Sequence, residues 1–444
     1  MKEVNRFSLT KRVFSIAWPM IISELGDSLY SIADTYFVSR LGPIALAAVA
    51  VGSYLSWLFF VAVILFTIGV LVITAQSYGA GKIEESRKAL GTSIVFGSLF
   101  TLAIAILTYY VAPIIVGVIV GTKGELLLST TKYFSIRILG LPILLTAFSM
   151  DSAIRGVGAT KYSMIALLSS SFLNIVLDPI LIYGLFGLPP LGVVGAALAT
   201  VISVSYIVPL EYVFLVKLGL TPSPKVSLDY LKRILSLGIP TSTERLIFSL
   251  GNNIYIALIA RCGSAALAAH QIGLRIESFI YMPGFAFSVA ASTLVGQEIG
   301  RGDIVKGKEL GMEAAKVASL FMGVLGLLIA LTSSYVVRPF SPNPDIARLA
   351  SIYLVLAGLS EPGLALAMTL SGAIRGGGNT LVPMIFNILG LYLFRVVPAY
   401  FLVLLLELGV VGAWLAMFID VYLRGFILLA IYDSLFTKLV RRIV

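Results

Sequence analysis

Polar and apolar residues of this chain are separated into long blocks. Three stretches contain no Asp, Glu, Lys, Arg or His: 43–81, 89–122 and 179–210. Each is longer than the roughly 20 apolar residues that one helix needs to cross a bilayer, so each must contain a turn or the end of a span. The pattern predicts twelve membrane-spanning helices. They are expected near 13–37, 46–77, 90–117, 125–150, 162–184, 190–215, 233–259, 266–298, 309–336, 346–371, 380–405 and 409–435.

The overall composition agrees with an all-α polytopic membrane protein. Of the 444 residues, 59% are hydrophobic and 12% are charged, and the mean hydropathy of +1.01 lies far outside the range of soluble proteins. Cys262 is the only cysteine and His270 the only histidine, which excludes an internal disulfide and any cluster of Cys or His ligands for a metal. We interpret His270 as a polar residue packed between helices.

The net charge of +10 is distributed unevenly over the connections between spans. Lys and Arg are concentrated at both termini and in the connections that follow the even-numbered spans. This positive-inside pattern predicts a multi-pass protein of the cell membrane with both termini in the cytoplasm. The basic charge therefore sets orientation, and we expect no nucleic-acid partner.

The second half of the chain repeats the first. Matching segments occur in the same order, such as "KRVFSIAWP" (11–19) with "KRILSLGIP" (232–240) and "AIRGVGAT" (153–160) with "AIRGGGNT" (373–380). Between the halves lies "LGLTPSPKVSLD", which has no apolar period and is typical of a linker. The expected domains are an N-lobe (1–218, helices 1–6), a cytoplasmic linker (219–230) and a C-lobe (231–444, helices 7–12).

The symmetry of this repeat favours a transporter. Each repeat contains six spans, an even number, so both six-helix lobes have the same orientation and form a parallel internal repeat. A cavity between two such lobes is the arrangement of many secondary transporters.

Acidic residues lie inside the predicted first and fifth spans. An ionised carboxylate at the bilayer centre costs roughly 3 kcal/mol, so it must face protein or water. Glu24, Asp27 and Asp34 are spaced to share one stripe of the first helix. At helical rise, Asp34 lies about 32 Å and Asp178 about 24 Å from the cytoplasmic start of their helices, so the two can meet in the outer half of the membrane. Asn174 lies one turn from Asp178 on the same face.

The repeat provides an internal comparison for these residues. In the second copy, Asp34 corresponds to Tyr255 and Thr200 to Met417. A residue that only the scaffold needs should occur in both copies, so we favour a functional role for Asp34 and Asp178. The alternative is that they are hydrogen-bond partners that hold the lobe together.

The acids of the second half are accompanied by arginines. The residues are Glu244, Glu277, Glu361 and Asp420, with Arg245, Arg275, Arg395 and Arg424. We interpret them first as a structural network of ion pairs. Glu244 and Glu361 are the best candidates among them for binding substrate or a second cation, because each lies near a proline (Pro240 and Pro362), where helices open.

Several motifs of the chain are shared with a known family. They are the "P…ADTxF…LG" pattern around Pro19 and Asp34, an "RGxGxT" turn in each half, "NIVLDP" (174–179) and "GAALAT" (195–200). Together they resemble the multidrug and toxic compound extrusion (MATE) transporters, and most of all their DinF-like prokaryotic branch. The resemblance covers essentially the whole chain.

The resemblance implies a fold, an activity and a set of site residues. The MATE fold has two six-helix lobes in a V shape around a central cleft, and its members export amphipathic, mostly cationic organic compounds in exchange for protons or sodium ions. The family's cation site, including any sodium ligands, falls on Asp34, Asn174, Asp178 and Thr200, with the backbone carbonyl of Ala196 as a further ligand.

Two further features of the first helix follow from the same resemblance. The proline that bends the family's first helix falls on Pro19, which we expect to act as a hinge. Glu24 and Asp27 depart from the branch, which more often has uncharged residues there, and they are additional candidates for binding substrate or a second cation.

Other membrane functions use some of these features. An intramembrane aspartyl protease also needs two aspartates on different helices, but a lobe-scale duplication is not expected of it. A lipid-linked precursor flippase of the wider superfamily would have a basic cavity, whereas the unpaired charges here are acidic. A channel would need a pore-lining ring of identical residues, which a duplicated monomer does not offer. We therefore expect a secondary exporter rather than an enzyme, monomeric, with small organic substrates and no cofactor besides its coupling ion.

Overall fold

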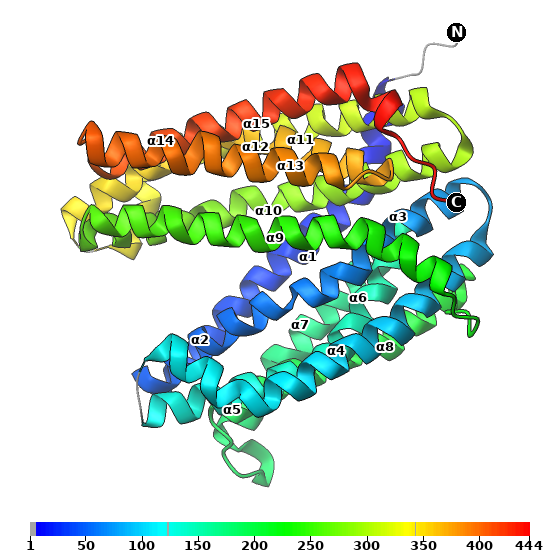
Figure 1. The fold of residues 1–444 in the computed structure, drawn as a ribbon. Helices are drawn as coiled ribbons and strands as arrows, with labels where there is room; N and C mark the ends of the chain where they lie inside the picture. The colour runs from blue at the N-terminus through cyan, green and yellow to red at the C-terminus, as the bar shows by residue number, and fades with distance from the viewer. Residues whose placement is uncertain (1–5, 122–123, 342) are drawn as a thin grey trace. The chain divides into compact units, whose positions relative to one another are not determined.

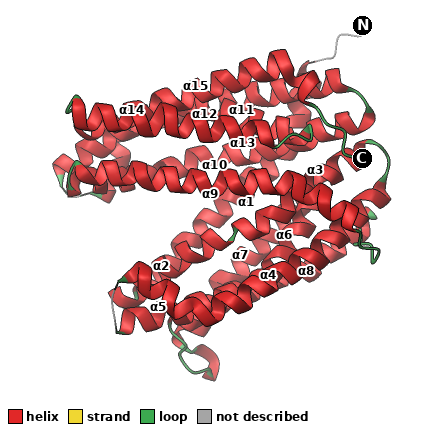
Figure 2. Cartoon of the chain, viewed as in Figure 1, coloured by secondary structure: helices red, strands yellow, loops and turns green. Residues whose placement is uncertain are grey.

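The computed structural model describes residues 6–121, 124–341 and 343–444, and these residues form helices and connections without a β-strand (Figure 1, Figure 2). In chain order the helices are α1 (Arg6–Ser39), α2 (Pro43–Phe59), α3 (Val61–Gly79), α4 (Ile83–Val120), α5 (Glu125–Leu139), α6 (Leu141–Gly156), α7 (Thr160–Tyr183), η1 (Leu185–Gly187), α8 (Val193–Leu218), α9 (Leu228–Arg261), α10 (Ser264–Arg301), α11 (Ile304–Val337), η2 (Arg338–Phe340), α12 (Pro344–Gly376), α13 (Leu381–Gly390), η3 (Leu391–Val396), α14 (Val397–Tyr400), η4 (Phe401–Leu405) and α15 (Gly409–Leu439).

Each predicted span coincides with one helix or with consecutive helices. The second span is α2 and α3, separated at Phe60, and the fourth is α5 and α6, which meet at Gly140 with a bend of 45°. The eleventh runs from α13 to η4 and contains turns of π-helix. Within the described ranges, nine helices are long and apolar enough to cross a membrane, or ten if the bent pair counts as one span. The expectation of an all-α chain is confirmed.

Contacts divide the chain into two compact units. The N-unit is Ile22–Ser242, and the C-unit combines 6–21 with Thr243–Val444. Both α1 and α9 therefore contribute to both units. The expected lobes were defined by the sequence repeat, as 1–218 and 231–444 with a linker at 219–230, and they stay a prediction. The contacts follow a different division, which falls inside α1 and inside α9.

The first turns of α1 and of α9 explain this division. Leu9, Val13 and two further residues of α1 are buried in one hydrophobic cluster with C-unit residues from α10, α11, α12 and α15. On α9, Ile234 is buried, and Ser242 donates a hydrogen bond to the carbonyl of Val61 at 3.3 Å. Each of these helices thus packs its first part and its second part in different hydrophobic cores.

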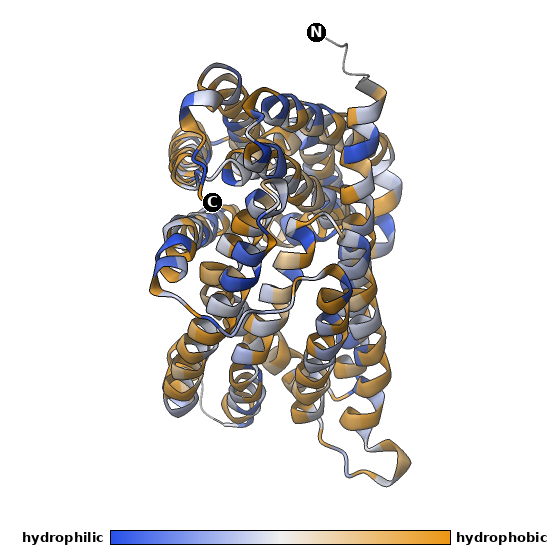
Figure 3. Ribbon diagram, turned by 90° about the vertical axis from the view of Figure 1, so that its right-hand side faces the viewer, coloured by the Kyte–Doolittle hydropathy of each residue, from blue (hydrophilic) through white to orange (hydrophobic). Residues whose placement is uncertain are grey.

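Large apolar side chains cover the outside of many helices. On α11, Leu320 and Leu331 are each 72% exposed, and hydrophobic residues run along the helices in Figure 3. Contiguous apolar surface of this extent is unfavourable in water but requires no cover in lipid. This surface and the apolar helices make the chain a multi-pass membrane protein.

Candidate functional site

Helices α7 and α8 of the N-unit bring together four of the residues predicted for the site. Asp178 and Asn174 lie one turn apart on α7, with 0% and 2% of their surface exposed. Ala196 and Thr200 lie one turn apart on α8 and are also buried. The i, i+4 spacing of each pair places both of its members on the face that the two helices share.

Close packing at Gly195 holds these two helices together. A Cβ added at Gly195 would lie 2.5 Å from the carbonyl oxygen of Leu181 on α7. Because that atom belongs to the backbone, no side-chain rotation can relieve the contact. A residue without a Cβ is therefore required at the point where α8 presents its polar face to α7.

A hydrogen-bond network joins the four residues. The Asn174 side-chain nitrogen donates to Asp178 Oδ2 at 2.9 Å, and its oxygen accepts from the Thr200 backbone N–H at 3.1 Å. This orientation of the amide is assigned, because it is the one that satisfies both of its ends. With oxygen and nitrogen exchanged, the oxygen would face Asp178 and the nitrogen would face the Thr200 N–H. The Thr200 hydroxyl in turn donates to the Ala196 carbonyl at 3.1 Å. Asn174 thus connects the buried Asp178 carboxylate to α8.

Helix α1 brings a second carboxylate to this network. Asp34 is half-buried, and it lies within electrostatic range of Asp178. One turn earlier, the hydroxyl of Tyr30 is 3.5 Å from Thr200 Oγ1 and also lies within range of Asp34. The structure therefore places Asp34, Asn174, Asp178, Thr200 and Ala196 in one group, which we call the paired-aspartate site.

Arg137 is a charged residue near this site that the sequence reasoning missed. It lies on α5, and its charge acts on both Asp34 and Asp27. Its Nε is buried and has no hydrogen-bond partner among the described residues. A signal was present in the sequence, because an arginine inside an apolar span normally faces an acid of another helix.

The paired-aspartate site can hold one positive charge. Two carboxylates repel one another in poorly hydrated surroundings unless a proton or a cation lies between them. The Asn174 amide presents its nitrogen to Asp178, while its oxygen is occupied by Thr200. Asn174 therefore does not offer an oxygen beside Asp178, as a sodium ligand would. This arrangement suits a proton better than the predicted sodium ligand set.

The two additional acids of α1 lie away from Asp178. Glu24 is half-buried and interacts electrostatically with Arg155 and Asp151 of α6, and with Asp27. Asp27 is exposed in the N-unit and has Arg137 as its charged neighbour. Glu24 therefore belongs to a different group of charges, and Asp27 lies between that group and the paired-aspartate site.

The acids of the C-unit fall into two kinds. Glu244 accepts hydrogen bonds from Arg375 at 2.7 and 2.8 Å and from Asn387 at 2.8 Å. Glu361 is fully buried, and neither of its oxygens has a hydrogen-bond partner among the residues that the structure describes. Glu244 is thus engaged within the C-unit, whereas Glu361 stays a candidate for binding substrate or a second cation.

The other C-unit acids have partners from neighbouring helices. Asp420 on α15 pairs with Arg395 at 2.9 Å and with Arg424 at 2.8 Å. Glu277 on α10 accepts a hydrogen bond from Tyr353 on α12. These contacts connect η3, α10, α12 and α15 and give the C-unit a buried polar framework.

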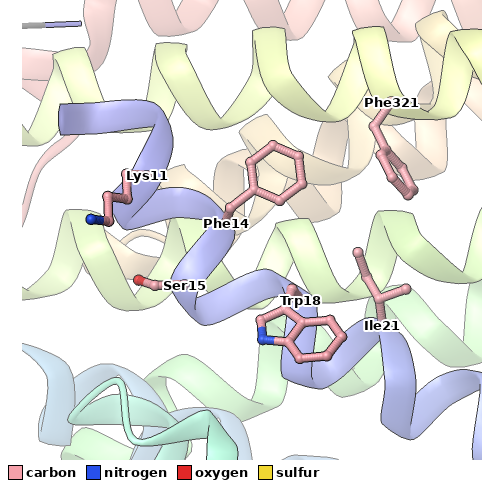
Figure 4. Close-up of a pocket in the computed structure, with 6 residues that line it drawn as sticks. All are labelled: Lys11, Phe14, Ser15, Trp18, Ile21 and Phe321. Atoms are coloured by element: carbon pink, nitrogen blue, oxygen red, sulfur yellow. The ribbon is translucent and has the colours of Figure 1, made fainter. Parts of the chain in front are cut away.

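An apolar groove lies between α1 and α11 in the C-unit (Figure 4). Its volume is about 460 Å³, and its lining residues are Lys11, Phe14, Ser15, Trp18, Ile21 and Phe321. The rings of Phe14 and Phe321 are 6.3 Å apart. No acid is among these lining residues, so the groove does not have the acidic character expected of a cavity for cations.

The chain matches a family model and several known proteins along its whole length. The MatE model matches residues 19–180 and 240–401, one match in each half. A probable multidrug resistance protein NorM from Thermotoga maritima is 31% identical over 435 residues, which cover 96% of this chain and 92% of that protein. An uncharacterized transporter, YisQ of Bacillus subtilis, is 26% identical over 94% of this chain and 93% of its own.

Solved structures show the same fold. A mutant of the Vibrio cholerae MATE transporter VcmN has a TM-score of 0.90, with 20% identity over 98% of each chain. A MOP superfamily transporter from Pyrococcus furiosus, described as having a binding pocket of reverse polarity, has a TM-score of 0.86, with 23% identity over 97% of this chain and 96% of its own. These likenesses and the two matches to the family model confirm the predicted family and fold. The chain is a member of the MatE family of transporters.

Proposed function

We propose that this chain is a secondary exporter, which moves amphipathic, mostly cationic organic compounds out of the cell in exchange for protons. The observation that carries this proposal is the hydrogen-bonded group of Asp178, Asn174 and Thr200, with Asp34 in electrostatic range. The names of relatives support the substrate class, since the Thermotoga maritima protein is called a probable multidrug resistance protein.

The proton is favoured over sodium by the orientation of the Asn174 amide. A proton needs one carboxylate oxygen, which either aspartate offers. A sodium ion needs several oxygens in a fixed shell, and here the Asn174 oxygen accepts from the Thr200 N–H instead. Sodium coupling would require this amide to turn over and break both of its hydrogen bonds.

Exchange follows from competition for negative charge. With both aspartates ionised, the site attracts an organic cation through the local field. A proton bound by the pair removes one of those charges, weakens that attraction and releases the cation. Coupling therefore requires Asp34 and Asp178 to act as a pair that either binds the proton or attracts the substrate cation, but does not do both at once.

Pro19 is proposed as the hinge that connects this site with opening and closing. A proline inside a helix lacks the N–H that would bond the carbonyl four residues earlier, which weakens that turn. α1 passes from the C-unit to the N-unit at Ile22, shortly after Pro19, and α9 passes between the units at Thr243, shortly after Pro240. The aligned prolines of the two repeats, Pro19 and Pro240, thus lie at positions where a bend in the helix would leave the packing inside each unit nearly unchanged.

The proposal also covers the location of the protein, its oligomeric state and the alternative of a flippase. We place the protein in the cell membrane as a monomer with both termini in the cytoplasm. A flippase is disfavoured because Arg375 and Arg424, two basic residues inside the C-unit, are paired with acids.

A catalytic role is disfavoured for a separate reason. Residues Gly300–Asp303 match the GxGD motif, which carries a catalytic aspartate in intramembrane aspartyl proteases. There, however, Asp303 begins α11 and accepts a hydrogen bond from the Lys306 N–H at 2.9 Å. This aspartate therefore caps a helix, which is a structural role.

Efflux from proteoliposomes tests the function and the ion together. The purified protein is reconstituted with a fluorescent organic cation, and efflux is followed under a proton gradient, a sodium gradient or neither. We expect efflux driven by the proton gradient alone. Efflux that responds only to sodium would overturn the choice of ion, and efflux that is the same in all three conditions would overturn coupling.

A further inference from the structure

A buried carboxyl group in the N-unit is not part of the paired-aspartate site. Glu211 on α8 has 0% of its surface exposed, and neither of its oxygens has a hydrogen-bond partner in the part of the chain that the structure describes. An ionised carboxylate in such surroundings is strongly unfavourable, because it has lost its hydration and gained no compensating contact. Glu211 is therefore protonated in this arrangement.

The charged neighbours of Glu211 come from α6. Glu211 lies within electrostatic range of Asp151 and Arg155. The Arg155 Nε is 2.5 Å from Asp151 Oδ2, and the Ser163 hydroxyl of α7 donates to Asp151 Oδ1. Asp151 is thus a direct ion-pair partner of the guanidinium, whereas the Glu211 oxygens accept no hydrogen bond from it in the described part of the chain.

Glu24 brings a third acid to the same place. From α1, it lies within range of both Arg155 and Asp151. Three carboxyl groups therefore surround one arginine, and only one of them has the arginine as a direct ion-pair partner. Because Glu24 is half-buried while Glu211 is fully buried, Glu24 is the member of this group that water reaches.

This group is far from the paired-aspartate site along the N-unit. Ser163 and Asp178 both lie on α7, and their separation of 15 positions corresponds to about 22 Å of helix. Asp151 and Ser163 lie close to the turn that joins α6, which ends at Gly156, to α7, which begins at Thr160. On α1, Asp27 lies within electrostatic range of Glu24, which belongs to this group, and of Arg137, which lies near the paired-aspartate site. Charged groups therefore continue from one site to the other.

We propose that Glu24, Asp151, Arg155 and Glu211 form a second proton-binding site, the turn-end site, which takes up and releases one proton near the α6–α7 turn. On uptake, hydronium in the water at Glu24 loses a proton and becomes neutral water, while an O–H bond forms on a Glu211 oxygen. On release, the proton returns to water, and the ionised Glu211 is left within electrostatic range of Arg155, which stays paired with Asp151. The proposal concerns proton binding, so it stands apart from the proposed function, although it adds a site to the same transport unit.

Infrared difference spectroscopy of the intact protein in lipid nanodiscs tests this site directly. A protonated carboxyl has its own C=O stretching band, and spectra are compared between acidic and alkaline pH. We expect a band that disappears as pH rises and that is absent from Glu211→Gln. Glu24→Gln removes one acid from the group and should shift the pH at which this band disappears.

A matched control separates the site from burial in general. Glu361→Gln removes another fully buried glutamate with two unpartnered oxygens, but from the C-unit. It should leave the Glu211 band and its pH dependence unchanged. Should Glu211→Gln not be recovered, Glu211→Asp keeps a carboxyl group and should shift the band.

Each outcome decides the proposal. A spectrum unchanged by Glu211→Gln, or a Glu211 band that ignores pH and Glu24→Gln, would show that no proton is exchanged here. The test is also independent of coupling. If Asp34→Asn abolishes driven efflux while the Glu211 band is missing, only the turn-end site fails. If the band behaves as expected while Asp34→Asn transports normally, only the proposed function fails.

Discussion

Replacing Gly195 with alanine probes how closely α8 must approach α7 for the paired-aspartate site to form. The new Cβ would lie 2.5 Å from the Leu181 carbonyl oxygen and 2.8 Å from the Ile182 nitrogen, whereas ordinary contacts begin at 3.4 Å. Both contacts are with backbone, so α8 must move away by about 1 Å. Overpacking of this kind costs about 1–3 kcal/mol of stability.

This movement should also weaken coupling. Gly195 directly precedes Ala196, so the displacement carries Ala196 and Thr200 away from Asn174 and stretches the 3.1 Å contact between the Thr200 N–H and the Asn174 oxygen. We expect Gly195→Ala to unfold at lower temperature in detergent and to lose most of its proton-driven efflux in proteoliposomes.

A second glycine provides the control for this experiment. A Cβ at Gly117, in α4 of the same unit, would meet only a side-chain atom of Leu127 at 3.9 Å. Gly117→Ala should therefore leave stability and efflux unchanged or slightly raise stability through its better helix propensity. If Gly195→Ala matches the wild type in both assays, the close approach of α7 and α8 does not position the site.

Three further predictions concern a buried ion-pair group, the proposed hinge and the charge of the substrate. Asp420→Asn leaves Arg395 and Arg424 without their shared carboxylate, so the free energy of unfolding should fall by about 3–5 kcal/mol. The same change at the exposed Asp433 should hardly alter the temperature of thermal unfolding, which serves as the measurement for both variants. Pro19→Ala restores a backbone donor, so substrate binding should persist while turnover in vesicles slows, and an unchanged turnover would remove the hinge from the mechanism. Of two dyes matched in size, the cationic one should be exported faster because the paired aspartates attract it, and equal rates would argue against an acidic site.

The membrane-spanning helices could be predicted from sequence because their signal is local. A run of about 20 apolar residues is sufficient to identify a span. The break at Phe60 and the 45° bend at Gly140 could not be read in the same way. Phe60 does not differ from the apolar residues around it, so packing against neighbouring helices decides where that span breaks. The bend at Gly140 does have a local cause, because Pro142 in the first turn of α6 cannot continue the hydrogen bonding of α5.

The paired-aspartate site was partly predictable for a similar reason. The spacing of Asn174 and Asp178 places them on one helix face, and the repeat drew attention to Asp34 because its counterpart is Tyr255. The direction of the Asn174 amide was not predictable, since it depends on the Thr200 N–H of another helix. Glu211 was missed as well, because only the packing of α8 against α6 brings it near Asp151.

The account depends most on Asp34 and Asp178 acting as one coupling site. Proton-driven efflux of an organic cation is measured for Asp34→Asn, Asp178→Asn and the double variant, with Asp229→Asn as a control that removes only an exposed ion pair with Arg233. We predict that each single change abolishes driven efflux, that the double variant is no worse than either, and that the control transports normally, as expected of groups that act as a unit. Near-normal driven efflux by either single variant would contradict the shared site.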